Sequence, residues 1–289
     1  MDAADTTAQA VTLFGVPETE RDEAPEGAGS GTDGPRSVAL LEPRAGGPAE
    51  RLAGRLGATH PVRAFLVTIV AGYAFLVGLT VAAGLVLTEL LVPVGGFERW
   101  DNGVSRWLAE RRDGTLTDLS WLGSTFAGGL VIPVVVGVLV VLFLVRRKWL
   151  LAAFTLFVIG VESGTYRAST LFVERDRPPV HRLEGLDPTA SFPSGHSAAT
   201  VALYGGLLFV GASWVGRRWG WALALCLTVA FALFVGWARM YRGMHHLTDT
   251  AAGVAMGCLA LAVTVFAARV ATAAANARDT AATAGEEGS

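Results

Sequence analysis

Six apolar stretches, each about as long as a membrane-spanning helix, are the feature that most limits how this chain can fold. A helix needs roughly 20 predominantly apolar residues to cross the hydrocarbon core of a bilayer. The composition agrees, because 52% of the residues are hydrophobic and only 17% are charged. The pattern predicts an all-α, polytopic membrane helix bundle. The six expected spans are Ala64–Leu91, Ala127–Val145, Trp149–Val173, Ser197–Val215, Trp219–Ala238 and Leu247–Ala268.

The regions before and after these spans differ from them in composition. Residues 1–60 are rich in Gly, Pro, Ala and acidic side chains and show no sustained periodicity, which is typical of disorder. We therefore expect a disordered segment over 1–60, a membrane domain over 61–270 and a disordered tail over 271–289. Cys226 and Cys258 lie within apolar stretches, where they are expected to pack as small apolar residues. No block of basic residues suggests a nucleic-acid partner.

Basic residues near the ends of the spans predict the orientation of the chain. Lys and Arg are enriched in short cytoplasmic connections. With six spans, one side receives most of these residues, namely Arg51, Arg55, Arg63, Arg146, Arg147, Lys148, Arg217, Arg218 and Arg269. The prediction is a multi-pass protein of the plasma membrane with both termini in the cytoplasm. Residues 93–126, 174–196 and 239–246 then face outward, although the four arginines of the first segment count against this orientation.

The first outward segment, Pro93–Phe126, mixes aromatic and charged residues. Phe97, Trp100, Trp107 and Trp121 stand among arginines and carboxylates there. This mixture is typical of short amphipathic helices at a membrane surface. Two interpretations remain open: a cover over a functional site, or a connector that is anchored by its aromatic residues.

A short polar motif, Pro193-Ser194-Gly195-His196, directly precedes the fourth apolar stretch. Serine is a preferred N-cap, so we expect a helix to begin here. The first amides of a helix have no partner within it and carry partial positive charge, which suits a phosphate group. Gly195 leaves room for oxygen atoms near the backbone, and His196 can deliver a proton beside them. By itself the motif is also compatible with an ordinary helix cap.

A second polar group connects the fifth and sixth stretches and contains Arg239, His245 and Asp249. On a helix, residues four apart share a face, so Asp249 could accept a proton from His245 and leave its other ring nitrogen as a nucleophile. The alternative is a buried His–Asp hydrogen bond without a catalytic role. Charged groups near membrane spans are costly, which favours the functional interpretation. A metal site is less favoured, because His245 and His246 are adjacent and no second carboxylate stands at ligand spacing.

Arg177, followed by Pro178, completes the set of polar residues. Arg177 and Arg239 offer planar donor groups that fit phosphate oxygens. We expect the neighbouring arginines to be solvated or to face lipid headgroups; these are Arg175, Arg182 and Arg242.

The three motifs together resemble the type-2 phosphatidic acid phosphatase superfamily in order and spacing. The resemblance extends over about Ala64–Ala268. It implies that His245 is a nucleophile that forms a phosphohistidine, that Asp249 orients it and that His196 is the general acid. It also implies that phosphate oxygens are held by Pro193–His196 through Ser194 and the Gly195 amide, and by Arg177 and Arg239. It implies no metal or other cofactor.

The first motif departs from the family pattern at one position. The family has a lysine seven residues before its Arg-Pro arginine, and Thr170 occupies that position here. Arg167 lies one helical turn earlier and is our candidate for a substitute cation. Alternatively, Arg167 pairs with Glu162. The serine that precedes the family arginine of the third motif is Ala238 in this chain.

Three functions follow as hypotheses. The first is an integral membrane phosphatase that hydrolyses a lipid-linked phosphate monoester or diphosphate on the extracytoplasmic face. The second is a phosphotransferase that uses the same phosphohistidine. The third is a non-catalytic transporter or scaffold, in which the polar residues join helices or line a pathway. The identity of the lipid and the oligomeric state are left open by the sequence.

Overall fold

The computed structural model describes residues 38–57, 59–185 and 187–287. Every regular element in this part of the chain is a helix. The helices are η1 (Ala39–Leu41), α1 (Pro48–Arg55), α2 (Pro61–Leu85), η2 (Val86–Leu91), α3 (Phe97–Ala109), α4 (Gly114–Phe126), α5 (Val131–Val145), α6 (Trp149–Phe172), α7 (Gly195–Ala199), η3 (Thr200–Gly205), α8 (Gly206–Val215), α9 (Arg218–Tyr241) and α10 (Leu247–Glu287).

The chain is a multi-span membrane protein, as its apolar stretches predicted. Five helical segments of the described residues are long and apolar enough to cross a bilayer: Pro61–Leu91, Trp149–Phe172, Gly195–Val215, Arg218–Tyr241 and Leu247–Ala281. A sixth span is formed only if α4 and α5 are taken together, because they meet at an angle of 42°. The expected span Ala127–Val145 is therefore broken at its beginning, where Gly128 and Gly129 disfavour a helix.

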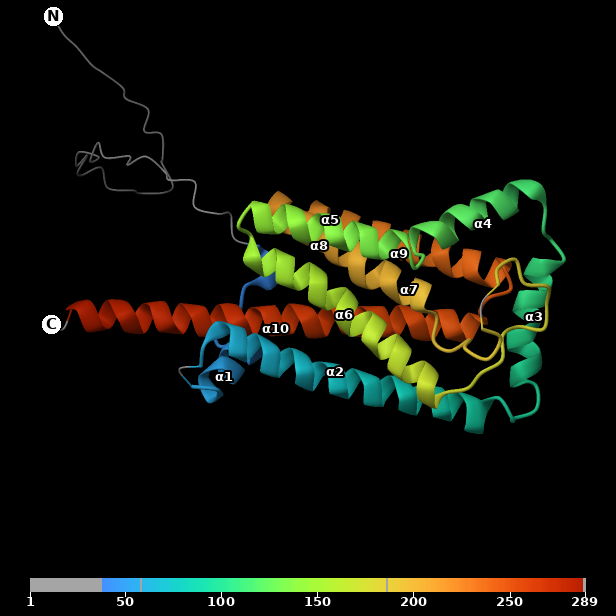
Figure 1. Cartoon of the computed structure of the whole chain (residues 1–289), viewed down its shortest axis with the longest axis horizontal. Coiled ribbons are helices and arrows are strands. Elements are labelled where there is room, and N and C mark those ends of the chain that lie inside the picture. The colour runs from blue at the N-terminus through green and yellow to red at the C-terminus, as the bar shows by residue number, and fades with distance from the viewer. Residues whose placement is uncertain (1–37, 58, 186, 288–289) are drawn as a thin grey trace, which may run out of the picture. The chain divides into compact units, whose positions relative to one another are not determined.

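The expected interfacial segment forms two helices, α3 and α4. Helix α3 is amphipathic in an unusual sense, because its buried face is largely polar and includes Asp101, Asn102 and Ser105. Trp100 and Trp107 lie on its exposed face. Figure 1 shows α3 across one end of the helices, near the start of α10. The interpretation of this segment as a cover is the one that this placement supports.

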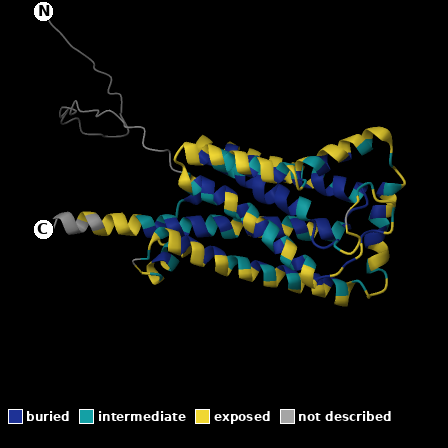
Figure 2. Ribbon diagram, viewed as in Figure 1, coloured by how far each residue is buried: buried dark blue, intermediate teal, exposed yellow. Residues whose placement is uncertain are grey.

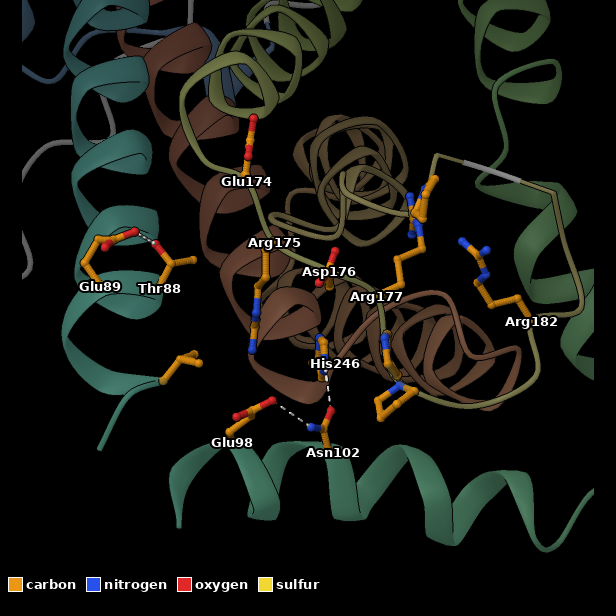
Figure 3. A pocket seen from close by; sticks show the side chains of 14 residues that line it. Thr88, Glu89, Glu98, Asn102, Glu174, Arg175, Asp176, Arg177, Arg182 and His246 are labelled. Carbon is orange, nitrogen blue, oxygen red and sulfur yellow. Dashed lines mark hydrogen bonds between the residues drawn. The ribbon is translucent and has the colours of Figure 1, made fainter. Parts of the chain in front are cut away.

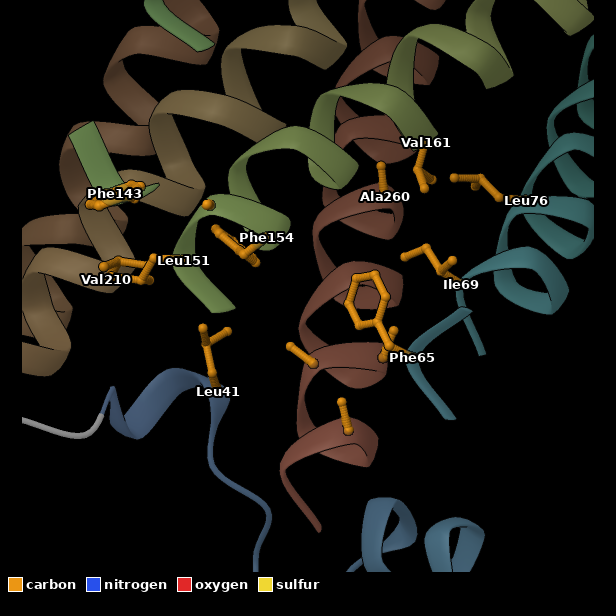
Figure 4. Close-up of a cluster of buried hydrophobic side chains, with 14 of the residues drawn as sticks. Leu41, Phe65, Ile69, Leu76, Phe143, Leu151, Phe154, Val161, Val210 and Ala260 are labelled. Carbon is orange, nitrogen blue, oxygen red and sulfur yellow. The ribbon is translucent and has the colours of Figure 1, made fainter. Parts of the chain in front are cut away.

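Figure 2 shows exposed residues on the outer faces of the helices and buried residues between them. The exposed residues include many large apolar side chains, and the buried residues include both small and large ones. The main apolar cluster surrounds α10 and includes Phe65, Ile69, Phe154 and Ala260 (Figure 4). Leu41 from η1 is also buried in this cluster. Exposed Val134, Val138 and Val141 on α5 are what a lipid-facing surface requires, since lipid does not oppose apolar exposure.

The segment boundaries that composition predicted do not coincide with the ends of the helices, either near the N-terminus or near the C-terminus. Within the expected segment 1–60, residues 1–37 and 58 lie outside the described residues, but η1 and α1 are ordered helices. Leu40 anchors η1 through a bond from its backbone N–H to Ser213 Oγ at 3.1 Å and one from Arg269 Nε to its carbonyl at 2.9 Å. At the other end, α10 continues to Glu287 through the expected tail.

The two ends of the helical unit differ in their connections. Figure 1 shows the α5–α6 and α8–α9 connections at the end near α1, and the α6–α7 and α9–α10 connections at the opposite end near α3. The first end carries the basic connections 146–148 and 217–218. The second end carries all three polar motifs. The polar motifs and the basic connections therefore lie at opposite ends of the spans.

Candidate active site

Ser194 caps the helix that follows it, as its position predicted. Its Oγ accepts the Ser197 N–H at 3.4 Å and the Ser197 hydroxyl at 3.0 Å. Ser194 is completely buried, and its own N–H donates to the Asp249 carbonyl at 3.0 Å. This bond joins the start of α7 to the start of α10. Gly195 and His196 in the first turn are only partly buried, so they can meet a ligand.

His245 lies in the turn between α9 and α10, before the helix begins at Leu247. The expectation that His245 and Asp249 share a helical face is therefore wrong. The ring nitrogen Nδ1 of His245 lies 2.7 Å from the Ser191 carbonyl oxygen. Because a carbonyl only accepts, Nδ1 carries the proton and Nε2 keeps its lone pair. Burial, followed by the positive charges of Arg239, Arg177 and His196, lowers the pKa of His245 well below its ordinary value.

Asp249 forms no hydrogen bond with His245. It accepts the Ser191 hydroxyl at 2.6 Å and the His246 backbone N–H at 2.8 Å, and His246 Nδ1 lies 3.1 Å away. An acidic residue in the first turn that accepts the N–H preceding the helix is a reciprocal capping arrangement. Since Asp249 holds Ser191, and Ser191 holds His245, the orienting effect that we expected from Asp249 passes through Ser191.

Arg175 was expected to be solvated, and the structure corrects this. Its side chain is buried between two carboxylates, with Nη2 2.7 Å from Asp101 Oδ2 and Nη1 bonded to Asp249 Oδ1. Thr248 also donates to Asp101. A buried guanidinium is tolerated because both carboxylates compensate its charge. These bonds connect the cover helix α3 to the first turn of α10.

Arg242 was also expected at a solvated or headgroup position, but it is buried against Glu184. Arg239 Nη1 also donates to Glu184, at 2.8 Å. Burial by itself would raise the pKa of Glu184, but the charge of Arg239 and hydrogen bonds from Ser124, Arg239 and Arg242 lower it to about 2. Glu184 is thus ionised at neutral pH and holds both arginines. Arg182, the third arginine that we expected at a solvated or headgroup position, is exposed.

Arg239 is completely buried, yet three of its five N–H groups have no partner among the described residues. Nη1 donates to Ser124 Oγ and Glu184, whereas Nε and Nη2 make no hydrogen bond with any described residue. Unpaired buried donors are costly and require an explanation. Two adjacent N–H groups on one edge of a guanidinium match the spacing of two phosphate oxygens. Arg239 is therefore arranged to bind an oxyanion.

Arg177 shapes the segment in which it lies. Its guanidinium donates to the carbonyls of Asp187 at 2.6 Å, Ala190 at 2.8 Å and Met244. A guanidinium has five N–H groups, so its two terminal nitrogens still offer one N–H each. Burial and the charge of Arg239 lower the pKa of Arg177. Arg177 thus ties the segment before α7 to the turn that carries His245.

A cavity of about 600 Å³ opens beside these groups (Figure 3). It lies between the end of the first span, helix α3 and the segment that follows α6. Figure 3 shows His246 facing Asn102 of α3, and the structure gives 2.9 Å between Nε2 and Oδ1. Arg175, Arg177 and His246 are shared by the cavity and the motifs. His196, His245 and Arg239 do not line it, so the cavity does not contain the two candidate catalytic histidines.

Two candidates from the first motif are not connected to the histidines. The Thr170 hydroxyl donates to the Arg167 carbonyl at 2.9 Å, within its own helix. The Arg167 side chain is exposed and forms no ion pair with Glu162 or any other described residue. Glu162 is buried and accepts the Ser163 hydroxyl at 2.8 Å. The pairing of Arg167 with Glu162 is therefore wrong, and the role of Arg167 as a substitute cation remains untested.

Several site residues escaped the sequence reasoning. They are Asp101, Asn102, Ser124, Glu184 and Ser191. The signal for Glu184 was its position as a carboxylate among several arginines. In the described residues, no group of three or more His, Cys, Asp or Glu side chains is arranged to hold a metal ion.

Comparison with known proteins supports the resemblance that the motifs predicted. Residues 148–272, which include all three motifs, match the model of the PAP2 superfamily. Among solved structures, the chain is similar to a transmembrane PAP2 type phosphatidylglycerolphosphate phosphatase from Bacillus subtilis. That match has 22% sequence identity and a TM-score of 0.52, and it covers 71% of this chain and 93% of the other. A second match is LpxE from Aquifex aeolicus, with 20% identity, a TM-score of 0.42, and coverage of 56% and 92%. No curated protein matches.

Proposed function

We propose that this chain is a membrane phosphatase that hydrolyses a lipid-linked phosphate monoester or diphosphate. The observation that carries the proposal is Arg239, whose buried Nε and Nη2 have no protein partner. The positive charge of Arg239 also acts on His245, which is held neutral and whose Nε2 keeps its lone pair. An oxyanion receptor next to a nucleophile is the arrangement that phosphoryl transfer requires. The PAP2 match and the shared fold with a PAP2 type phosphatase support the same reaction.

The chemistry would proceed in two steps. His245 Nε2 attacks phosphorus, a P–N bond forms and the P–O bond to the leaving group breaks. His196 gives its proton to the leaving oxygen, so that the lipid alcohol departs from a monoester and the lipid monophosphate departs from a diphosphate. Water then attacks phosphorus while His196 removes a proton from the water. A P–O bond forms, the P–N bond to His245 breaks, and inorganic phosphate is released with both histidines restored. Arg239, Arg177 and the first amides of α7 hold the charge on the phosphoryl oxygens.

The location of the motifs supports a lipid substrate on the extracytoplasmic face. All of them lie at the end of the spans opposite the basic connections 146–148 and 217–218. Short basic connections favour the cytoplasm. A phosphate headgroup at the outer surface could then reach the site while its acyl or prenyl chain remains in the bilayer. We also propose a plasma-membrane location with cytoplasmic termini on this basis.

The decisive experiment measures inorganic phosphate released by the purified full-length protein in detergent micelles. The substrates are phosphatidic acid, phosphatidylglycerol phosphate and a polyprenyl diphosphate, each with a water-soluble phosphate ester as the comparison. We expect release from at least one lipid and little from the soluble ester. If no lipid phosphate in the panel releases inorganic phosphate, the proposal is contradicted.

Orthovanadate should inhibit this activity more strongly than inorganic phosphate does. Vanadate adopts the five-coordinate geometry of the transferring phosphoryl group, and transition-state analogues bind at least about 10²-fold more tightly than ground-state ligands. The measurement is a pair of inhibition curves on the same lipid substrate. Equal potency of the two anions would contradict a site built for phosphoryl transfer.

Replacing Gly253 with alanine should reduce the activity although Gly253 touches no substrate. A methyl group at Gly253 would lie 2.3 Å from the Ser194 carbonyl oxygen, so α7 would have to move away from α10. A misplacement of about 1 Å can cost up to about 10²-fold in rate. Phosphate release by Gly253→Ala is expected to fall between about tenfold and 10²-fold. The matched control is Gly160→Ala, because a methyl there would meet nothing within 4 Å.

A further inference from the structure

The two α6 residues that the sequence singled out, Thr170 and Arg167, form no hydrogen bond with another residue of the proposed phosphate site. The Thr170 hydroxyl is used by the Arg167 carbonyl at 2.9 Å. The Arg167 side chain is exposed. Arg177 and Arg239 therefore remain as the two guanidiniums at the histidines. A third donor from α6 would have to come from another residue on the same face of that helix.

Tyr166 lies on that face, four residues and about one turn before Thr170. Its ring lies against Gly195 in the first turn of α7, where a methyl group would be 3.2 Å from Tyr166 Cδ2 and 3.4 Å from Cε2. The ring thus borders the helix start whose amides face the phosphate. Its hydroxyl makes no hydrogen bond with any described residue, and the side chain is half-buried.

The same phenol is electrostatically coupled to both arginines of the site. Burial and the charge of Arg239 lower the pKa of Arg177, and Tyr166 partly offsets this effect. Tyr166 also interacts with Arg239. The ring packs on the glycine between Ser194 and His196, so the phenol lies at the start of α7, and its charge interactions reach both guanidiniums.

We propose that the Tyr166 hydroxyl donates a hydrogen bond to a non-bridging oxygen of the phosphate. This inference rests on the proposed function. Tyr166 would supply a neutral donor on α6, and its bond would strengthen as charge develops on the phosphoryl oxygens. A phenol adds no charge, so the oxyanion would be neutralised by Arg177 and Arg239 while Tyr166 contributes geometry and polarity. Because the bond is strongest in the transition state, kcat should depend on it more than KM does.

The test is Tyr166→Phe, which keeps the ring on Gly195 and removes only the hydroxyl. We expect kcat for the lipid phosphate to fall about 10²-fold, as when one donor to developing charge is lost. KM should change much less, and inhibition by orthovanadate should weaken by a factor similar to that in kcat. The thermal stability should stay as in the wild type, because no hydrogen bond to the protein is lost.

The matched control is Tyr73→Phe, since Tyr73 also packs on a glycine, Gly164 of α6, with its Cε2 3.0 Å from the position of an added methyl group. This variant should retain the activity of the wild type. If Tyr166→Phe keeps its kcat and its sensitivity to vanadate, or if both variants lose activity equally, the inference is overturned. A wild-type protein that releases no phosphate would instead overturn the proposed function, so the two failures are distinguishable.

Discussion

Replacing His245 with alanine is expected to lower phosphate release from a lipid phosphate by at least about 10³-fold. The substitution removes the only nitrogen that the proposed mechanism uses as a nucleophile. The Ser191 carbonyl holds the ring so that Nε2 is unprotonated, and burial between cations keeps it neutral. The residual rate would come from substrate binding and from the donors of Arg177 and Arg239. The measurement is phosphate release by purified protein at saturating lipid.

A matched control separates this effect from general damage. His181→Ala changes an exposed histidine in the segment between α6 and α7, and it should leave the rate unchanged. The wild-type protein should also accumulate a covalently phosphorylated form when a radiolabelled substrate is quenched in alkali, and His245→Ala should not. Full activity of His245→Ala, or labelling of the protein without His245, would overturn the assignment of the nucleophile.

The fold could be predicted because the bilayer restricts it. A segment of apolar residues in lipid must satisfy its backbone internally, so each stretch such as Trp149–Phe172 or Arg218–Tyr241 becomes a helix almost regardless of its neighbours. The start of α7 could also be predicted from the local sequence, because Ser194 caps the amides directly after it. The break before α5 was not predicted, because the apolar character continues through it and only two glycines mark the change.

The hydrogen bonds and ion pairs of the site could not be predicted, because they join residues that are distant in the sequence. Arg175 donates to Asp101 and Asp249, each 74 residues away. Arg239 donates to Glu184, which is 55 residues away. The spacing of His245 and Asp249 suggested a shared helical face, but the turn at Gly243, with its φ of +72°, delays the helix until Leu247. Motif spacing thus indicated which residues meet, whereas the tertiary fold decides which atoms bond.

Replacing Asp249 with alanine is expected to destabilise the protein by about 3 kcal/mol and to abolish most of its activity. Asp249 accepts bonds from Arg175, Ser191 and His246. Removal of one partner from a buried charge network leaves the others uncompensated. The loss is at the lower end for such networks, because Arg175 keeps its pair with Asp101. Thermal unfolding in detergent and phosphate release should be measured on the same preparation.

Measured together, these two properties separate direct from indirect orientation of the nucleophile. If Asp249 held only His245, its removal would lower the rate and leave the stability close to that of the wild type. In the network that we describe, Ser191 also loses its acceptor, so Ser191→Ala should lower the rate in the same direction, and by less, because its carbonyl remains. The control is Asp118→Ala on the exposed face of α4, which should change neither property. An Asp249→Ala protein with the stability of the wild type would show that the network contributes nothing and that Asp249 acts on His245 alone.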